Sequence, residues 1–276
     1  RAAAKNFQHV VVVVDPADYQ ATMDQLDRPG GLSVEYRLSL ACKAFAHTRS
    51  YDDTIAGALS SVGVTDGSLS RGAPPVEPLA PDTLVLTVGR QRMLRYGENP
   101  HQTAALYADG AVGFGGARVV QGKELSFTNL LDLDAALTIV RDFDAPASVV
   151  IKHNNPCGCA IDETLAVALE KAYAGDPVSA FGSIISFNRP VDLATAEFLC
   201  EPNRFVEAIL APSFDDDAFE ALTTRPKWKK NVRLMRCAAL GSERPASRDY
   251  RRVTGGLLVQ DRDEQADPEA DWTVPT

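Results

Sequence analysis

Cysteine is scarce and irregularly placed in this sequence of 276 residues, which contains only five: Cys42, Cys157, Cys159, Cys200 and Cys237. An odd number without regular spacing argues against a disulfide framework and is typical of a protein from a reducing compartment. Cys157 and Cys159 have one residue between them instead of two, and no second pair of Cys or His lies near them in the sequence. Because this spacing does not match a zinc site, we predict that the chain holds no metal.

Long apolar runs and an excess of positive charge are also missing. No stretch approaches the roughly twenty apolar residues of a membrane span, so we expect no membrane partner. The formal net charge of −9 argues against a nucleic-acid partner, which needs a basic face, but leaves room for a local basic pocket that holds a phosphate. The first residues, Arg1–Asn6, lack an initiating Met and the apolar core of a signal peptide. We therefore expect a cytoplasmic protein of which this chain is a fragment.

The sequence of the first 82 residues indicates the end of one domain followed by a connector. Val10–Val14 is a valine run typical of a central strand in a parallel sheet, and Pro16 suits the start of a helix. No strand precedes this run, so its sheet partners are missing. Residues 33–59 show a mostly helical pattern with alternating acids and bases, which predicts a solvated helical connector. Residues 60–82 are rich in Ser, Gly and Pro, including Gly72–Pro75, and predict a linker at a domain boundary.

From residue 83 onward, strand and helix patterns alternate. The predicted strands are Leu84–Val88, Ser148–Ile151, Ala180–Phe187, Phe205–Leu210, Asn231–Cys237 and Val253–Val259. The predicted helices follow Asn129, Asp162 and Asp192, each of which suits an N-cap, and a fourth helix is predicted over Asp215–Leu222. Strands that alternate with helices of about ten residues are typical of an α/β fold, and we predict a three-layer sandwich.

The most informative stretch follows the buried strand Ser148–Ile151. Lys152 and His153 come directly after it, and the Asn, Pro and Gly residues that follow predict a loop. Polar groups at the carboxyl end of a buried strand in an open α/β sheet often bind ligands. Lys152 and His153 would supply a charge stabiliser and a proton carrier side by side. A solvated lysine beside a structural histidine is an equally open interpretation.

Four further segments contain candidate binding residues. Arg95 offers bidentate donors for a phosphate or carboxylate, and Tyr96 offers an aromatic face with a hydroxyl. Gly182 would let a ligand approach the backbone, and Glu207 interrupts an apolar strand, so it must face solvent or meet a donor. Lys230 belongs to a basic cluster that could meet a phosphate. A stacked surface Arg–Tyr pair, a bulge glycine and a solvated lysine cluster remain open alternatives.

Five segments in a fixed order carry a resemblance to a known family: Leu94–Gln102, Gln121–Asn129, Lys152–Gly158, Ser179–Asn188 and Phe205–Pro212. Together they resemble the bifunctional PurH family of purine biosynthesis, which couples a transformylase for aminoimidazole carboxamide ribonucleotide (AICAR) to an IMP cyclohydrolase. The resemblance runs from Arg1 to about Gln260. It implies transfer of a formyl group from the co-substrate 10-formyltetrahydrofolate to the amine of AICAR, which gives FAICAR, and closure of FAICAR to IMP.

The resemblance also implies roles for individual residues. His153 matches the proton acceptor of formyl transfer, and Lys152 matches the residue that stabilises the transition state. Lys5 matches the lysine that moves a proton in ring closure. The positions that bind the nucleotide are matched by Arg95, Tyr96, Gly182 and Glu207, to which we add Lys230 as a basic candidate for substrate binding.

The same resemblance implies a division of the chain and a partner. Residues 1–30 would be the C-terminal end of the cyclohydrolase domain, whose fold is similar to methylglyoxal synthase, and residues 31–82 a helical connector and linker. Residues 83–276 would be the first part of the transformylase domain, which is similar to cytidine deaminase but without zinc. The rest of both domains, including most of the folate site, would lie outside this chain. The family forms its sites at a dimer interface, so a homodimer is expected.

Two other functions stay open on the sequence alone. A catalytically incomplete nucleotide-binding module would keep Arg95 and Lys152 but lack the folate half. A zinc-dependent deaminase is a third possibility, by fold analogy only.

Overall fold

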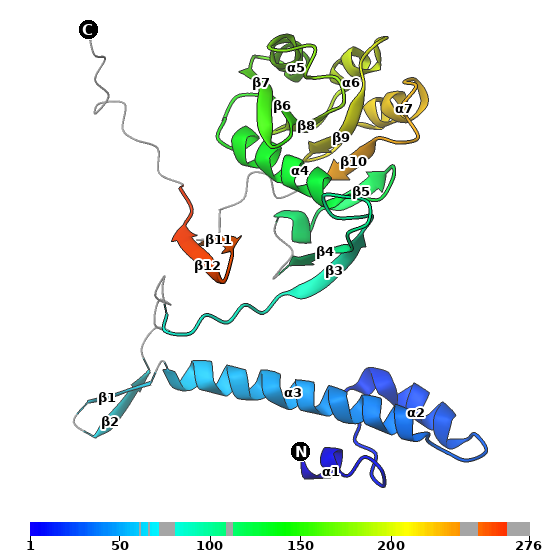
Figure 1. Cartoon of the computed structure of the whole chain (residues 1–276), viewed down its shortest axis with the longest axis vertical. Coiled ribbons are helices and arrows are strands. Elements are labelled where there is room, and N and C mark those ends of the chain that lie inside the picture. The colour runs from blue at the N-terminus through cyan, green and yellow to red at the C-terminus, as the bar shows by residue number, and fades with distance from the viewer. Residues whose placement is uncertain (61, 66, 72–80, 109–112, 238–247, 264–276) are drawn as a thin grey trace. The chain divides into compact units, whose positions relative to one another are not determined.

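A computed structural model describes residues 1–60, 62–65, 67–71, 81–108, 113–237 and 248–263 (Figure 1). The chain divides into two compact units, Arg1–Asp82 and Thr83–Thr276. The segment Gly72–Pro75, which we predicted as part of a linker, lies outside the described residues.

The first unit is mainly helical. Its elements are α1 (Ala2–Lys5), the 3-10 helix η1 (Pro16–Asp18), α2 (Tyr19–Leu26), α3 (Val34–Ser60), β1 (Val62–Thr65) and β2 (Ser68–Arg71). The helix predicted over 33–59 is confirmed as α3. Lys43 on α3 contacts Asp15 and Asp18 at 2.6 and 2.7 Å, which ties α3 to η1. The segment predicted as a linker contains the antiparallel hairpin β1–β2.

The strand predicted at Val10–Val14 is wrong, because the described residues give this segment no strand partner. A strand is stable only when neighbouring strands accept and donate its backbone hydrogen bonds. Val12 and Val14 instead pack against the buried Ala4, Ala41 and Ala44. Small alanine side chains let the short helix α1 approach α3 closely, and the valines cover this contact.

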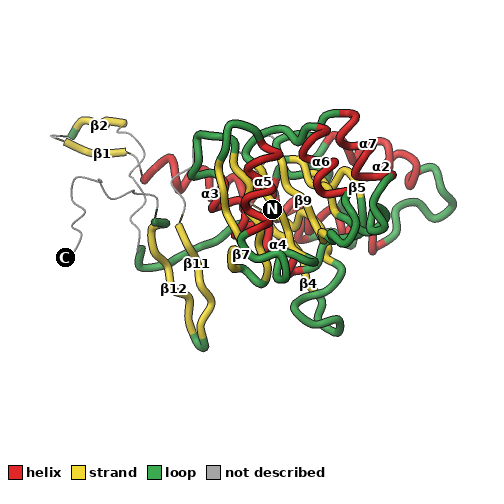
Figure 2. Tube along the Cα trace, turned by 90° about the horizontal axis from the view of Figure 1, so that it is seen from above, coloured by secondary structure: helices red, strands yellow, loops and turns green. Residues whose placement is uncertain are grey.

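The second unit is an α/β structure. Its strands are β3 (Gly89–Leu94), β4 (Ala104–Ala108), β5 (Arg118–Gln121), β6 (Ala147–Lys152), β7 (Asn155–Ile161), β8 (Ser183–Phe187), β9 (Val206–Ala211), β10 (Arg233–Arg236), β11 (Arg248–Val253) and β12 (Gly256–Asp261). Its helices are η2 (Gly113–Gly115), α4 (Phe127–Val140), α5 (Leu165–Ala174), α6 (Leu193–Cys200) and α7 (Asp216–Thr224). Strands β3–β4 and β11–β12 form separate hairpins, and Figure 2 shows the second of these as two arms joined by a tight turn.

Six strands form a mixed sheet in the order β5-β10-β9-β8-β6-β7. Strands β8, β9 and β10 are parallel, whereas β6 runs antiparallel to β8, β7 to β6, and β5 to β10. Because β6 is reversed, its C-terminal end lies at the same edge as the first residues of β8, β9 and β10. The Lys152–His153 pair therefore lies at the amino ends of the parallel strands, not at their carboxyl ends as the rule for open parallel sheets would give.

Helices cover both faces of this sheet, as the α/β prediction requires. Side chains alternate along each strand, so Val149 and Ile151 pack with α4, whereas Val150 packs with the cluster that includes α5, α6 and α7. Leu133 and Leu137 of α4 are buried, and each contributes about 2 kcal/mol through removal of apolar surface from water. Helix α4 is therefore a rigid part of the core.

The strand predicted at Leu84–Val88 is also wrong, since the strand begins later, at Gly89. Strand β4 pairs only with Gly89–Leu94, and Val85 remains 71% exposed. An apolar run predicts a strand well only where a partner strand reaches it. The strand's end at Leu94 is nevertheless the feature that matters for the site, because Arg95 and Tyr96 follow directly.

Two predicted helix caps are corrected by the structure. Helix α4 is capped by Ser126, not Asn129: the Ser126 Oγ accepts from the Asn129 N–H at 3.2 Å, and Asn129 Oδ1 accepts from the Ser126 N–H at 3.1 Å. This reciprocal pair is a capping box with Asn129 as its third helical residue. Helix α5 is capped by Thr164, because Asp162 forms an ion pair with Lys171 instead.

The predicted loop after Lys152 is shorter than expected. Asn155–Gly158 is part of β7, so the turn consists of His153 and Asn154 alone. Of the helices in the described part of the chain, none combines the length and the apolar character that a membrane crossing needs.

Candidate functional site

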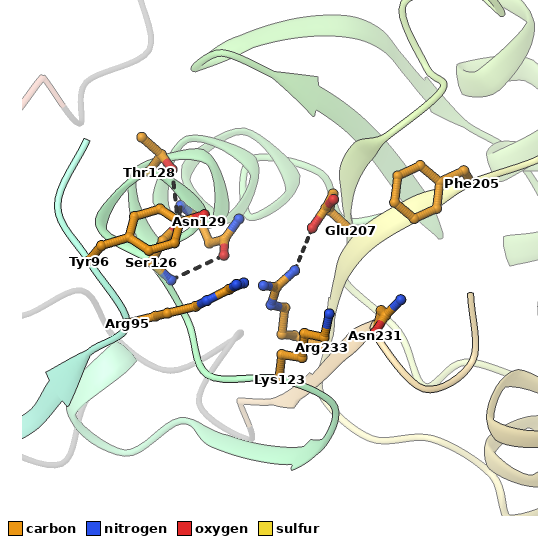
Figure 3. A pocket seen from close by; sticks show the side chains of 10 residues that line it. All are labelled: Arg95, Tyr96, Lys123, Ser126, Thr128, Asn129, Phe205, Glu207, Asn231 and Arg233. Carbon is orange, nitrogen blue, oxygen red and sulfur yellow. Dashed lines mark hydrogen bonds and ion pairs between the residues drawn. The ribbon is translucent and has the colours of Figure 1, made fainter. Parts of the chain in front are cut away.

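A pocket of about 290 Å³ opens at the sheet edge where β9 and β10 begin (Figure 3). Its lining residues are Arg95, Tyr96, Lys123, Ser126, Thr128, Asn129, Phe205, Glu207, Asn231 and Arg233. They come from the segments after β3 and β5, the first turn of α4 and the starts of β9 and β10. Three cations and one carboxylate are among them, so the pocket is locally basic although the chain as a whole is acidic.

Backbone hydrogen bonds hold Arg95 and Tyr96 at this pocket. The Arg95 N–H donates to the Leu125 carbonyl at 2.9 Å, and the Phe127 N–H donates to the Tyr96 carbonyl at 3.0 Å. The Arg95 guanidinium lies 5.2 Å from the centre of the Tyr96 ring, within the range of a cation–π contact. The stacked Arg–Tyr pair is therefore present, and it faces a pocket formed with α4.

The first turn of α4 forms one wall of the pocket. Backbone N–H groups and the helix dipole make the start of a helix favourable for an anion. Ser126 is buried and fixes the helix start through the capping box, while Thr128 and Asn129 are half-buried. The wall therefore offers hydroxyl, amide and backbone donors to a polar ligand.

An ion pair between Arg233 and Glu207 forms the opposite wall. The Arg233 side chain is 5% exposed, and its guanidinium also approaches the Glu124 carbonyl at 3.4 Å. Glu207 thus meets a donor, which was one of the two outcomes expected for a carboxylate in an apolar strand. Figure 3 shows the guanidinium groups of Arg95 and Arg233 pointing toward one another. Glu207 offsets the charge of Arg233, and an anion bound between the two guanidinium groups would offset that of Arg95 as well.

Lys152 and Gly182 lie along the same sheet edge, outside the pocket lining. The Lys152 ammonium donates to the Phe181 carbonyl at 2.9 Å, and the Gly182 N–H donates to the Phe205 carbonyl at 2.7 Å. Gly182 has φ +77, a conformation that favours glycine. Phe205 lines the pocket, so Gly182 connects the Lys152 segment to the pocket wall.

Asp176 is a second group near Lys152. Hydrogen bonds from Ser179 hold the pKa of Asp176 below its ordinary value of 3.8, and the charge of Lys152 adds to this effect. Lys152 therefore has both a carbonyl and a carboxylate in its surroundings, and only one of its three donors is used by the Phe181 carbonyl.

His153 lies in the turn between β6 and β7 and is exposed. Both turn residues have positive φ, 55 for His153 and 63 for Asn154. This is the geometry of a two-residue type I′ hairpin turn, and it costs about 1–2 kcal/mol for a residue with a Cβ. The Asn154 N–H donates to Asp132 Oδ1 of α4 at 2.7 Å. Burial raises the pKa of Asp132, while this hydrogen bond and the charge of His153 oppose the rise.

The remaining two candidates, Lys230 and Lys5, are not among the residues that line this pocket. Lys230 is exposed in the turn before β10, next to Asn231, and is not among the lining residues. Lys5 belongs to the first unit, where it lines a separate pocket of about 500 Å³ with Arg1, Phe45 and Asp52 among others. The structure thus brings Arg95, Tyr96 and Glu207 together and places Lys152, His153 and Gly182 along the same sheet edge. Lys230 does not line the pocket, and Lys5 belongs to the first unit.

Several lining residues were not singled out from the sequence. Lys123, Ser126, Thr128 and Asn129 belong to the segment Gln121–Asn129, whose polar character was the available signal. Arg233 gave no signal, because it lies inside a short strand and its role depends on a fold that brings it to Glu207. No group of three His, Cys, Asp or Glu residues that could hold a metal ion occurs among the described residues.

The fold and the pocket define a class: an α/β protein with a cationic site at one edge of a mixed sheet. The chain belongs to the AICARFT/IMPCHase bienzyme family, whose model matches residues 3–276. The resemblance drawn from the five sequence segments is therefore confirmed.

Comparison with individual proteins agrees with this membership. The chain is 48% identical over 280 residues to the bifunctional purine biosynthesis protein PurH of Rhodopirellula baltica, covering 100% of this chain and 51% of that protein. It is 45% identical over 276 residues to the protein of the same name from Acidithiobacillus ferrooxidans, covering 99% and 50%. For the corresponding protein of Halalkalibacterium halodurans, the identity is 43% over 279 residues, covering 100% and 51%. The chain spans about half the length of the curated relatives it matches.

Proposed function

We propose that this chain is part of a longer bifunctional enzyme of purine biosynthesis and contributes to its AICAR transformylase site. The reaction transfers a formyl group from 10-formyltetrahydrofolate to AICAR and gives FAICAR, which the whole protein then closes to IMP. The observation that carries the proposal is the pocket in which Arg95, Tyr96 and Glu207, from distant segments, meet at the sheet edge where β6 ends with Lys152 and His153 follows.

The pocket suits a ribonucleotide monophosphate. Arg95, Lys123 and Arg233 provide positive charge for the phosphate, and Arg95 adds the planar fork that matches its oxygens. Tyr96 offers a ring for stacking against the base, and Glu207 can accept from hydroxyl or amide donors. Gly182 leaves the backbone open to close approach, and we retain Lys230 as a peripheral cation next to the lining residue Asn231.

The chemistry needs a base and a stabiliser of negative charge. The amine nitrogen of AICAR attacks the formyl carbon, so a new C–N bond forms and an oxyanion develops. Lys152 stabilises this oxyanion electrostatically. His153 takes the proton that the amine loses, because an aromatic amine is a weak nucleophile until that proton leaves. The bond from the formyl carbon to N10 of the folate then breaks, and the proton is returned to N10, so tetrahydrofolate leaves.

The finer assignments belong to the same proposal. Residues 1–30 form the C-terminal end of the cyclohydrolase domain, with a methylglyoxal synthase-like fold and Lys5 as the proton-moving residue of ring closure. Residues 31–82 form the connector and linker, and residues 83–276 form the first part of a cytidine deaminase-like transformylase domain that uses no zinc. We propose a cytoplasmic homodimer with sites at its interface.

The test compares binding with turnover in the full-length protein that contains this chain. Wild-type protein should convert AICAR and 10-formyltetrahydrofolate to FAICAR, and His153→Ala should lose turnover while it still binds AICAR in calorimetry. Binding without turnover in the wild-type protein would instead support the nucleotide-binding module. Stoichiometric zinc in the purified active protein would support the deaminase alternative.

A further inference from the structure

The turn that carries His153 has an unfavourable conformation that its own sequence does not explain. Type I′ turns favour Asn, Asp or Gly at both central positions, because both need positive φ. Asn154 fits this preference, whereas His153 carries a larger side chain at φ 55. A turn of this kind keeps its geometry only when contacts outside it hold the backbone in place.

Asp132 on α4 supplies such a contact. Its Oδ1 accepts from the Asn154 N–H at 2.7 Å, directly after His153 in the chain. Within the turn, the Asn155 side-chain amide donates to the His153 carbonyl at 2.9 Å. The peptide unit between His153 and Asn154 is therefore held by two hydrogen bonds, one of which comes from a different element.

The element that supplies Asp132 is rigid and also forms the pocket wall. Leu133, the next residue along α4, is 0% exposed, so the helix cannot shift without disturbing the core. Thr128, one helical turn before Asp132, lines the basic pocket. A single helix thus forms one wall of the pocket, packs against β6 and holds the backbone that carries His153.

We propose that Asp132 is the positioning residue of His153 in formyl transfer. Its carboxylate holds the β6–β7 turn through the Asn154 N–H, and this contact sets where the imidazole meets the amine of a nucleotide bound in the pocket. The inference rests on the proposed function, because it needs His153 to act as the proton acceptor. Asp132 does not touch the reacting atoms, and its effect passes through the turn.

The experiment uses the full-length protein with three substitutions. Asp132→Ala removes the acceptor, and Asp132→Asn keeps an acceptor oxygen. Asp134→Ala is the control, because it removes a carboxylate of the same helix whose pKa is also raised by burial but which is not the acceptor of the Asn154 N–H. Two readouts are compared with wild type: kcat and KM for AICAR in formyl transfer, and hydrogen exchange of the peptide that contains Asn154. Thermal unfolding of each variant verifies that it is folded.

For Asp132→Ala we expect kcat to fall on the order of 10²-fold, as for a misplaced catalytic group, with KM for AICAR unchanged and faster exchange at Asn154. Asp132→Asn should restore most of kcat and the protection of Asn154, and Asp134→Ala should match wild type in both. A purely structural role would lower stability without this split between kcat and KM and without rescue by Asn.

Three results overturn the inference. They are an unchanged kcat in folded Asp132→Ala, a higher KM for AICAR in place of a lower kcat, and an Asp132→Asn variant as slow as Asp132→Ala. These results differ from failure of the proposed function. That failure would be seen in the wild-type protein, if it shows no formyl transfer, or in His153→Ala, if it remains active. In that case the inference falls with the function on which it rests.

Discussion

The ion pair between Arg233 and Glu207 joins two side chains of unequal burial. Arg233 is 5% exposed and Glu207 is 38% exposed. A buried guanidinium cannot regain water when its partner is removed, whereas a half-exposed carboxylate can. At the scale of single residues, the cost of breaking this pair therefore depends on which partner is taken away.

This asymmetry predicts different stabilities for two variants of the chain. Glu207→Gln should lower the free energy of unfolding by about 2 kcal/mol, a value below that of a fully buried pair because Glu207 is partly hydrated. Arg233→Met should cost about 1 kcal/mol, since the thioether side chain fills part of the space and Glu207 turns to water. Urea unfolding followed by circular dichroism measures both. The exposed pair Arg225–Glu197 is the control, and Glu197→Gln should change stability little. Equal losses for the two test variants would contradict the argument.

The pKa of Asp132 predicts the pH dependence of a second variant. Burial raises this pKa, so the folded state binds the proton more tightly than the unfolded state. The relative stability that Asp132 provides is full below the ordinary pKa of 3.8 and is lost as pH rises through the raised value. At pH 7 the charged form therefore costs stability, and Asp132→Asn should be at least as stable as wild type. The difference in stability between Asp132→Asn and wild type, measured by thermal unfolding, should become smaller as pH falls toward 3.8.

Asp176 serves as a control because its pKa is shifted in the opposite direction from that of Asp132. Its pKa is lowered by the hydrogen bonds from Ser179, so its contribution is present above the unfolded value and is lost as pH falls through the lowered value. Asp176→Asn should therefore be less stable than wild type at pH 7, and this deficit should shrink in acid. If Asp132→Asn and Asp176→Asn both lost stability at pH 7, burial of Asp132 would not govern its titration.

At the scale of elements, the N-terminus of α4 has two tasks that one comparison can separate. Ser126 closes the capping box and lines the pocket, whereas Asp192 caps α6, accepts from the Thr195 N–H at 2.8 Å and does not line this pocket. We predict that Ser126→Ala and Asp192→Ala each lose about 1 kcal/mol of stability, as is usual for a lost N-cap. Only Ser126→Ala should also weaken AICAR binding, by about threefold, because the frayed helix start stabilises the phosphate less. Thermal unfolding and calorimetry on both variants measure the two effects, and equal affinities would exclude α4 from the phosphate site.

Elements with their own periodic pattern were predictable from the sequence, and elements that depend on distant partners were not. The helix after Asn129, which is α4, could be predicted because the helical spacing of apolar residues such as Leu130, Leu133 and Leu137 is a local property of the sequence. Val10–Val14 has an equally strong strand pattern, but no partner strand among the described residues completes it. The order and direction of the strands could not be predicted from the sequence either. Because β6 runs antiparallel to β8, Lys152 lies at the amino ends of the parallel strands.

The candidate site shows the same division between local and distant information. Arg95, Tyr96 and Glu207 could be selected because each interrupts or follows an apolar run. Arg233 could not be selected, because its importance comes from contact with Glu207 on a neighbouring strand. The turn geometry of His153 was likewise unpredictable, since histidine is an unusual residue at positive φ and the contact that holds it comes from α4.

At the scale of the whole molecule, the distribution of charge favours selective binding of a small anion. The chain carries a formal net charge of −9, yet the pocket gathers Arg95, Lys123 and Arg233 around a single carboxylate. The acidic surface disfavours extended polyanions such as nucleic acids, while the local field attracts a phosphate that enters the pocket. Added salt should therefore weaken AICAR binding, because it screens the attraction of the exposed Arg95 and Lys123 for the phosphate. The buried Arg233 is screened less, so part of the affinity should remain.

The last prediction concerns coverage: the chain spans about half the length of the relatives that it matches, and the proposed function needs the full-length protein. Under the proposed function, the cations and the aromatic ring that would hold the nucleotide all lie within residues 95–233 of this chain, so we expect this chain to bind AICAR. The co-substrate site is expected mostly outside it, because the chain covers 51% of a relative such as the protein of Rhodopirellula baltica. The isolated chain should therefore bind AICAR in calorimetry and form no FAICAR, whereas the full-length protein should do both. Arg95→Ala should weaken AICAR binding in the two proteins alike, which verifies that the same pocket is measured. Formyl transfer by the isolated chain would contradict this division and would place the folate site within this chain.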